Sequence, residues 1–194
     1  MKVNLKADDY YSQRNNTVNP FEACMPTSRV MWYCGERIPW TAPQGEQPED
    51  YFMELLSGEA ARKFCTEKYP WSVNVPPNEV HGMYGSWLDP HVTGARRSDF
   101  RIDLKWQDYI DLIDSGHVIM TAGAFPTTKG HAVCVIGYED AATLILADPY
   151  GDYTTDYKSP NGYGVRMIRP DFERIINGNE AGKWGHVPID WKAE

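Results

Sequence analysis

Two blocks in the second half of the chain decide the fold class: Gly130-His131-Ala132-Val133-Cys134-Val135-Ile136-Gly137-Tyr138 and Ala147-Asp148-Pro149-Tyr150-Gly151. The first block predicts an apolar strand over residues 131–138, followed by a four-residue turn at 139–142. The second block ends the return strand, predicted over 143–148, because Pro149 has no N–H to donate to a neighbouring strand. The two blocks therefore predict an antiparallel hairpin.

The register of this hairpin brings an imidazole and a carboxylate together. A turn at 139–142 pairs Tyr138 with Thr143 and, farther along, Val133 with Asp148. His131 and Val133 share a face of the first strand, so Asp148 is a diagonal neighbour of His131 on that face. A carboxylate in this place can hold an imidazole in one tautomer and orientation. A histidine and an aspartate with no shared purpose remain the alternative.

A cysteine begins the first long helix. Asn19-Pro20 predicts a turn, Pro26 is tolerated only in a first helical turn, and Gly35 is a natural C-terminal stop. Cys24 then lies at the N-terminus of this helix, where the backbone dipole and unpaired N–H groups favour a thiolate. The simpler alternative is a cysteine that only packs in the core.

The rest of the chain predicts an α+β fold, with helices first and strands later. Helices are predicted over 49–56, 59–69, 106–114 and 170–176, and strands over 117–122 and 164–168. The segment 71–100 is read as a long irregular loop, a kind of segment that is usually functional or disordered. In it, His81 is interpreted as a surface residue, and His186, near the C-terminus, as structural.

Composition excludes several classes of protein. The 194 residues carry 19 Lys and Arg against 27 Asp and Glu, a net charge of −8, which argues against nucleic acid and anionic membranes as partners. No apolar run is long enough for membrane insertion, and no signal peptide is visible, so synthesis in the cytoplasm is expected. The length favours a single domain over 1–194. The four cysteines are expected to be free thiols.

The spaced residues Gln13, Asn16 and Pro20, the block Cys24-Met25-Pro26-Thr27-Ser28 and the two hairpin blocks together resemble the C39-like group of papain-fold cysteine peptidases. The resemblance implies a papain-like fold, with the nucleophile helix packed on an antiparallel sheet. It implies that Cys24 is the nucleophile, His131 its base and Asp148 the group that orients His131. Gln13 and the backbone N–H of Cys24 would donate to the oxyanion.

The substrate cleft is harder to predict. Met25 follows the nucleophile where many relatives have Gly, and its bulk is expected to narrow the cleft. Tyr84 and Trp87 are expected to line the cleft, with ordinary loop packing as an equal alternative. No metal ion or other cofactor is expected.

The resemblance implies hydrolysis of peptide bonds through a thioester. The leading hypothesis is a phage lysin-type endopeptidase that cuts peptidoglycan and is released to the cell wall by a separate export or lysis system. Processing of a protein or leader peptide, acyl transfer to an amine, and a papain-fold binding module without turnover remain alternatives. The sequence does not indicate the oligomeric state.

Overall fold

The computed structural model describes residues 1–127, 130–176 and 184–191. Its α-helices are α1 (Cys24–Gly35), α2 (Pro48–Ser57), α3 (Glu59–Lys68), α4 (His81–Met83), α5 (Asp89–Thr93), α6 (Trp106–Asp114) and α7 (Arg169–Ile175). Its strands are β1 (Lys2–Val3), β2 (Ser98–Arg101), β3 (Ile119–Gly123), β4 (His131–Asp140), β5 (Thr143–Ala147), β6 (Tyr163–Ile168) and β7 (Gly185–Pro188). Short helical turns complete it at η1 (Ala7–Asp9), η2 (Gln13–Asn15), η3 (Pro70–Ser72), η4 (Pro77–Glu79), η5 (Tyr84–Leu88) and η6 (Tyr153–Thr155).

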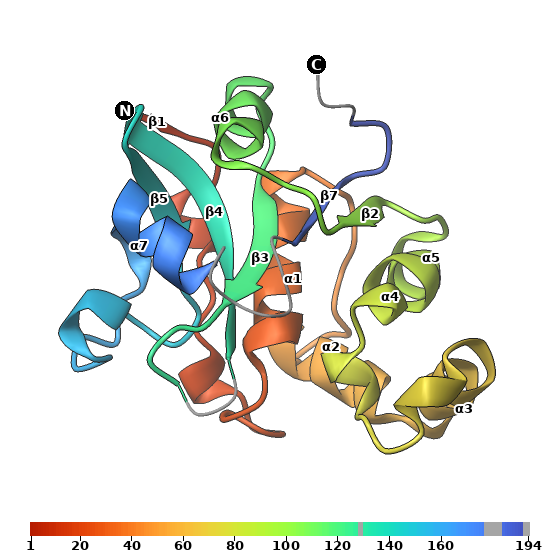
Figure 1. Ribbon diagram of the computed structural model, residues 1–194. Helices are drawn as coiled ribbons and strands as arrows, with labels where there is room; N and C mark the ends of the chain where they lie inside the picture. The colour runs from red at the N-terminus through yellow and green to blue at the C-terminus, as the bar shows by residue number, and fades with distance from the viewer. Residues whose placement is uncertain (128–129, 177–183, 192–194) are drawn as a thin grey trace.

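The described strands form one antiparallel sheet in the order β2-β7-β3-β4-β5-β6, and β1 pairs with the far end of β4 (Figure 1). The central strand β4 lies between β3 and β5 and carries His131 at its first position. This mixture of helices and an antiparallel sheet confirms the α+β fold class predicted from the sequence, and it is the architecture that the resemblance to papain-fold peptidases implies.

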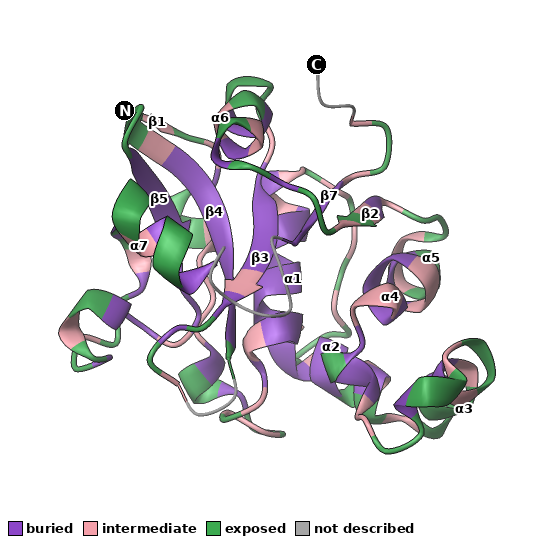
Figure 2. Cartoon of the chain, viewed as in Figure 1, coloured by how far each residue is buried: buried purple, intermediate pink, exposed green. Residues whose placement is uncertain are grey.

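Both faces of the sheet are covered. On β4, Ala132, Cys134 and Ile136 pack into the cluster that contains α1, whereas Val133 and Val135 pack into the cluster that contains α6 and α7. Figure 2 shows β3, β4 and α1 as largely buried and the outer sides of α3 and α7 as exposed. A strand that is buried on both faces has no polar face, which explains the unbroken apolar sequence of this block.

Helix α1 is docked on β4 by polar contacts as well as by packing. The Ser28 hydroxyl donates to the carbonyl of Ala132 at 3.1 Å, and the Cys134 thiol donates to the carbonyl of Ser28 at 3.1 Å. These contacts lie one turn after Cys24 on the helix and one to three residues after His131 on the strand. They fix the start of α1 relative to the start of β4.

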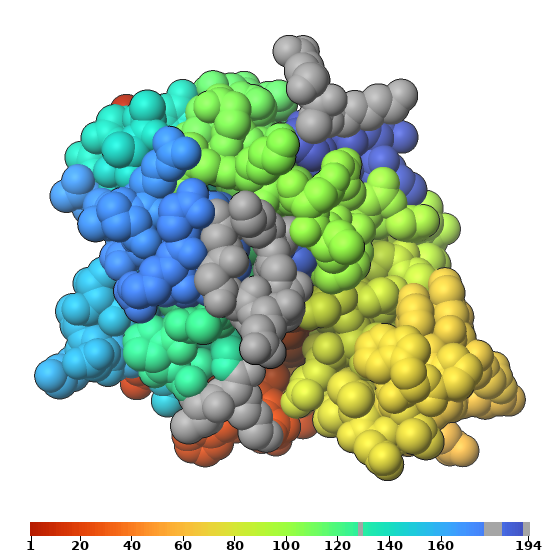
Figure 3. Space-filling view, in the orientation of Figure 1, coloured from red at the N-terminus to blue at the C-terminus, as the bar shows by residue number. Residues whose placement is uncertain are grey.

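The segment predicted as an irregular loop at 71–100 is instead a series of short helical turns that ends in β2. Its anchor is Asp89, which is fully buried and accepts hydrogen bonds from Arg29 and Tyr33 of α1 and from the Ser98 backbone. A buried carboxylate needs such partners because desolvation of an unpaired charge is costly. Figure 3 shows α3 and the turns after it forming one side of the molecule, with α7 on the other.

The predicted hairpin is correct at one end and wrong at the other. Cys134 pairs with Ala147, the register that places Val133 opposite position 148. Two register shifts follow toward the turn, so that Asp140, and not Tyr138, pairs with Thr143. Strand β4 therefore extends to Asp140, and only two residues join it to β5.

Candidate active site

Cys24 is the first residue of α1, as predicted, and its side chain is partly exposed. The preceding residue Ala23 accepts the N–H of Thr27, which closes the first turn of the helix. Pro26 is accommodated because the first-turn N–H groups have no partner inside a helix. The thiol therefore lies at the positive end of the α1 dipole, within reach of an incoming molecule.

His131 and Asp148 form a buried pair. His131 Nε2 donates to Asp148 Oδ1 at 2.6 Å, and the two side chains are 3% and 0% exposed. The same oxygen accepts the backbone N–H of Tyr150 at 2.9 Å. With Nε2 engaged, Nδ1 of His131 is the ring nitrogen left for Cys24, which lines the same hollow and adds to the rise in the pKa of His131.

The charge of His131 is set by these neighbours. Burial disfavours the imidazolium, but the charge of Asp148, its hydrogen bond and the contact with Cys24 outweigh burial and raise the pKa of His131 to about 10. At neutral pH the ring therefore holds its proton beside the sulfur of Cys24. A positively charged ring beside the sulfur is the kind of neighbour that a cysteine nucleophile needs.

Aromatic rings enclose the His131–Asp148 pair. Phe125 and Tyr157 meet the imidazole edge-on, with ring centroids 5.6 and 5.8 Å from it. The Tyr157 hydroxyl also donates to Asp148 Oδ2 at 3.4 Å. The rings exclude water, which strengthens the electrostatic attraction between His131 and Asp148.

Gln13 lies at the same cleft. Its backbone N–H donates to the carbonyl of Pro149 at 2.9 Å, and its side-chain Nε2 donates to the carbonyl of Pro20 at 2.8 Å. An amide NH₂ has two N–H donors, so one remains available. Gln13, Cys24 and His131 line the same hollow in the surface, of about 400 Å³.

The loop after Asp148 is tied to the N-terminal segment, a feature that the sequence did not indicate. Tyr10 donates its hydroxyl to the Asp148 carbonyl at 2.9 Å, and the Asp148 N–H donates to the Gly162 carbonyl at 2.9 Å. A Cβ on Gly162 would lie 1.9 Å from the Asp148 carbonyl oxygen, so only glycine fits there. Asp148 is thus fixed through its backbone as well as through its carboxylate.

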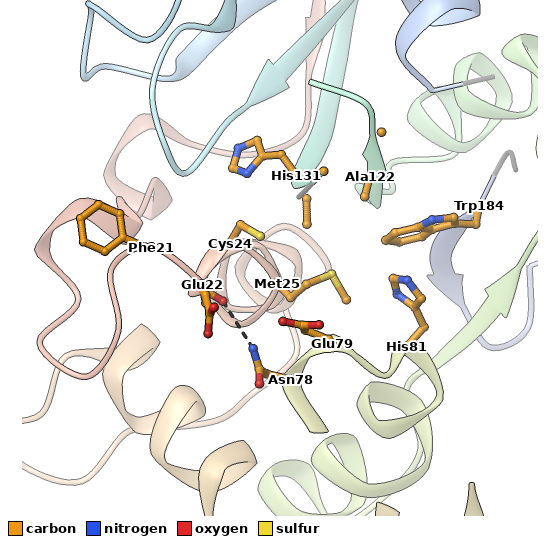
Figure 4. Close-up of a pocket in the computed structure, with 13 residues that line it drawn as sticks. Phe21, Glu22, Cys24, Met25, Asn78, Glu79, His81, Ala122, His131 and Trp184 are labelled. Atoms are coloured by element: carbon orange, nitrogen blue, oxygen red, sulfur yellow. Dashed lines mark hydrogen bonds between the residues drawn. The ribbon is translucent and has the colours of Figure 1, made fainter. Parts of the chain in front are cut away.

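A second pocket, of about 260 Å³, opens on Cys24 (Figure 4). Met25 lines it, as expected. Tyr84 is fully buried beneath this region, and Trp87 lies at a different hollow between α2 and α3. The aromatic groups that the structure brings to the pocket are instead His81 and Trp184, which sequence reasoning did not connect with the site.

The geometry agrees with one comparison with known proteins. The family model of the Peptidase_C39 like family matches residues 8–168. This range contains the four residues described above: Gln13, Cys24, His131 and Asp148. The chain belongs to the Peptidase_C39 like family. No curated protein and no solved structure gives a significant match to the chain.

Membership of the C39-like family supports cysteine peptidase activity and a peptide as substrate. Two further findings concern only the described residues. No helix among them has the length and apolar character needed to cross a bilayer. No three His, Cys, Asp or Glu side chains of the described ranges are grouped as metal ligands would be.

Proposed function

We propose that the protein is a cysteine peptidase in which Cys24 is the nucleophile, His131 the general acid and base, and Asp148 the orienting carboxylate. The observation that carries this proposal is the 2.6 Å hydrogen bond between His131 and Asp148 beside the partly exposed Cys24, with Cys24 and His131 lining one cleft. A nucleophile, a base and a group that orients the base are the three parts that covalent catalysis requires.

The chemical steps follow from these positions. The Cys24 thiolate attacks the amide carbon, and the charge moves to the carbonyl oxygen. The free N–H of Gln13 and the backbone N–H of Cys24 stabilise that oxyanion, a contribution commonly worth about 3 kcal/mol per donor. Collapse of the intermediate breaks the C–N bond, and His131 gives its proton to the leaving amine.

The remaining thioester is then hydrolysed. His131, now neutral, takes a proton from water while the water oxygen attacks the thioester carbon. Collapse expels the Cys24 thiolate and releases the acid, and His131 again holds its proton. Asp148 stabilises the imidazolium at the start and at the end of this cycle.

We propose the peptide part of bacterial peptidoglycan as the substrate, as in a phage lysin-type endopeptidase. Membership of the family implies a peptide substrate, and similar C39-like domains occur in cell-wall lytic enzymes, which supports this choice. Such a role requires that the protein, made in the cytoplasm, reach the wall through a separate export or lysis system. Processing of a protein or leader peptide is the alternative substrate for the same residues.

Mass spectrometry of purified peptidoglycan tests the function. Digestion with the wild-type protein should release new free amines, and Cys24→Ala should abolish them. Cys34→Ala, a change in the same helix away from the cleft, is the matched control and should retain activity. If walls of several chemotypes stay intact, peptidoglycan is not the substrate, and the same comparison is repeated on a proteome-derived peptide library. No cleavage there either would favour a binding module.

A further inference from the structure

The pocket beside Cys24 has two walls, one formed by the sheet and the other by helical segments. Figure 4 shows Ala122 and His131 on the sheet side and Met25 and Glu79 on the opposite side, with His81 and Trp184 near one end. The Cys24 sulfur lies between the two sides. A chain bound across Cys24 would therefore place a side chain in this pocket.

The pocket carries negative charge. Glu79 and Glu22 both line it, and its described lining includes no Lys or Arg. Glu22 Oε2 accepts a hydrogen bond from Asn19 at 2.9 Å, so this carboxylate is engaged. Glu79 is exposed, and its carboxylate has no hydrogen bond or ion pair with another described residue. The Glu79 carboxylate is therefore available to form an ion pair with a positively charged group of a ligand.

Aromatic rings complete the pocket. The indole of Trp184 and the imidazole of His81 have ring centroids 3.9 Å apart. Burial lowers the pKa of His81 to about 4, so this ring is neutral near pH 7 and does not repel a cation. An indole face attracts an ammonium or guanidinium group, the latter most often.

The position of Glu79 is fixed before any ligand binds. Glu79 belongs to the short turn η4, in which its N–H donates to the carbonyl of Pro76 at 2.9 Å. The hydroxyl of Tyr84 donates to the carbonyl of Asn78 at 2.8 Å, which holds the turn from below. A pre-organised carboxylate loses less entropy on binding than a mobile one.

We propose that Glu79 and the indole of Trp184 form a subsite for a cationic side chain of the substrate, one that ends in an ammonium or guanidinium group. The inference rests on the proposed peptidase function, because it assigns the pocket to the peptide that Cys24 cleaves. Its chemistry selects a basic amino acid, or a diamino acid with a free amine, at one position beside the scissile bond.

Two matched pools of synthetic peptides test the subsite. They are identical except that one contains Lys where the other contains norleucine. Wild type should cleave the Lys pool with kcat/KM about tenfold higher, because a carboxylate contact and a cation–π contact add. Glu79→Gln should reduce the preference to the part supplied by the indole of Trp184, and Glu79→Lys should reverse it toward a third pool with Glu at that position. The preference should also weaken at high salt.

Glu67→Gln, which removes the same charge from the exposed surface of α3, is the control and should leave the preference intact. Binding of the pools to Cys24→Ala, measured by calorimetry, separates the two proposals. If no pool is cleaved but the Lys pool still binds more tightly through Glu79, the subsite stands and the peptidase function fails. Equal cleavage and equal binding of the Lys and norleucine pools, or a preference that Glu79→Gln leaves unchanged, would overturn the subsite.

Discussion

Two histidines at the same pocket have opposite electrostatic properties. His131 is buried against the carboxylate of Asp148, and its pKa is raised to about 10. His81 is packed among aromatic rings, no carboxylate of a described residue shifts its pKa, and burial lowers that pKa to about 4. Burial disfavours the charged ring in both cases, so the partner decides the charge. The cleft thus combines a proton-carrying imidazole on one side with a neutral one on the other.

His186 resembles His81, because burial lowers its pKa as well. It is 1% exposed, its two ring nitrogens have no hydrogen-bond partner among the described residues, and its pKa lies well below the usual value because of burial, with Arg29 and His81 adding to the effect. Its ring centroid is 5.9 Å from that of His81. The two histidines therefore form a neutral cluster that a proton would destabilise.

Removal of the carboxylate should make His131 resemble His81, with the largest effect of the changes that bear on these two histidines. Asp148→Ala leaves burial as the main influence on His131, so its pKa should fall below its ordinary value, as NMR titration would detect. Without the imidazolium partner, kcat/KM should drop about a thousandfold. Asp148→Asn keeps the hydrogen-bond acceptor without the charge and should lose less. Unchanged kcat/KM in Asp148→Ala would show that the pair is only structural.

The neutral cluster should make the fold sensitive to acid. The unfolded chain binds a proton at His81 near pH 6.5 and the folded protein only near pH 4, so the unfolded state takes up more protons between these values. The contribution of His81 is fully present above pH 6.5 and is lost as the pH falls toward 4, by up to about 3 kcal/mol. Urea unfolding at several pH values measures this loss.

A matched pair of variants isolates His81 in that experiment. His81→Phe should flatten the dependence between pH 6.5 and 4, whereas His91→Phe, a change at an exposed histidine stacked on Trp87, should not. If the two variants lose stability equally with acid, the neutral cluster is not the cause.

A new carboxylate beside His81 should move it toward the behaviour of His131. Phe100 stacks on His81 with ring centroids 5.0 Å apart and is 38% exposed, so it tolerates a polar replacement. Phe100→Glu should raise the pKa of His81 by about 1. Phe100→Gln, which is similar in shape but neutral, is the control. An equal pKa in both variants would contradict the electrostatic comparison.

The smallest effect is expected at the edge of the His131–Asp148 pair. Tyr157→Phe removes only the hydroxyl, whose contact with Asp148 Oδ2 is long at 3.4 Å. Because the ring remains and still excludes water, kcat/KM should fall about threefold or less, a range set by a hydrogen bond worth roughly 0.5 kcal/mol. A loss near that of Asp148→Ala would mean that the hydroxyl, rather than the ring, supports the carboxylate.

Much of the His131 side of the pocket could be predicted from the sequence, because the contacts that position it join residues close together in the chain. Hairpin pairing is short-range, and the register relating His131 to Asp148 is correct at the site although the turn was misplaced. The turn was misplaced because each of the two register shifts leaves one extra residue in β4 without disturbing the apolar pattern. Cys24 could be placed at the start of a helix from the residues that begin and end helices, which are also local signals in the sequence.

The other side of the pocket could not be predicted because its contacts are long-range. His81 and Trp184 are more than one hundred residues apart in sequence and meet only because β7 pairs with β2 and β3. His81 was interpreted as a surface residue, yet it packs against Phe100 and Trp184. The turns that carry Glu79 owe their place to Asp89 and its partners on α1. No local pattern encodes such contacts.

Alkylation of the four cysteines tests the central claim most directly. Iodoacetamide labelling at pH 6 to 7, followed by mass spectrometry, compares Cys24 with Cys34, Cys65 and Cys134 in one sample. Burial and then Asp9 raise the pKa of Cys34 to about 11, and Cys65 and Cys134 are buried. Cys24 should react at least about tenfold faster than the others, and should lose this advantage in Asp148→Ala. Equally slow labelling of all four thiols would contradict the proposal that His131 and Asp148 activate Cys24.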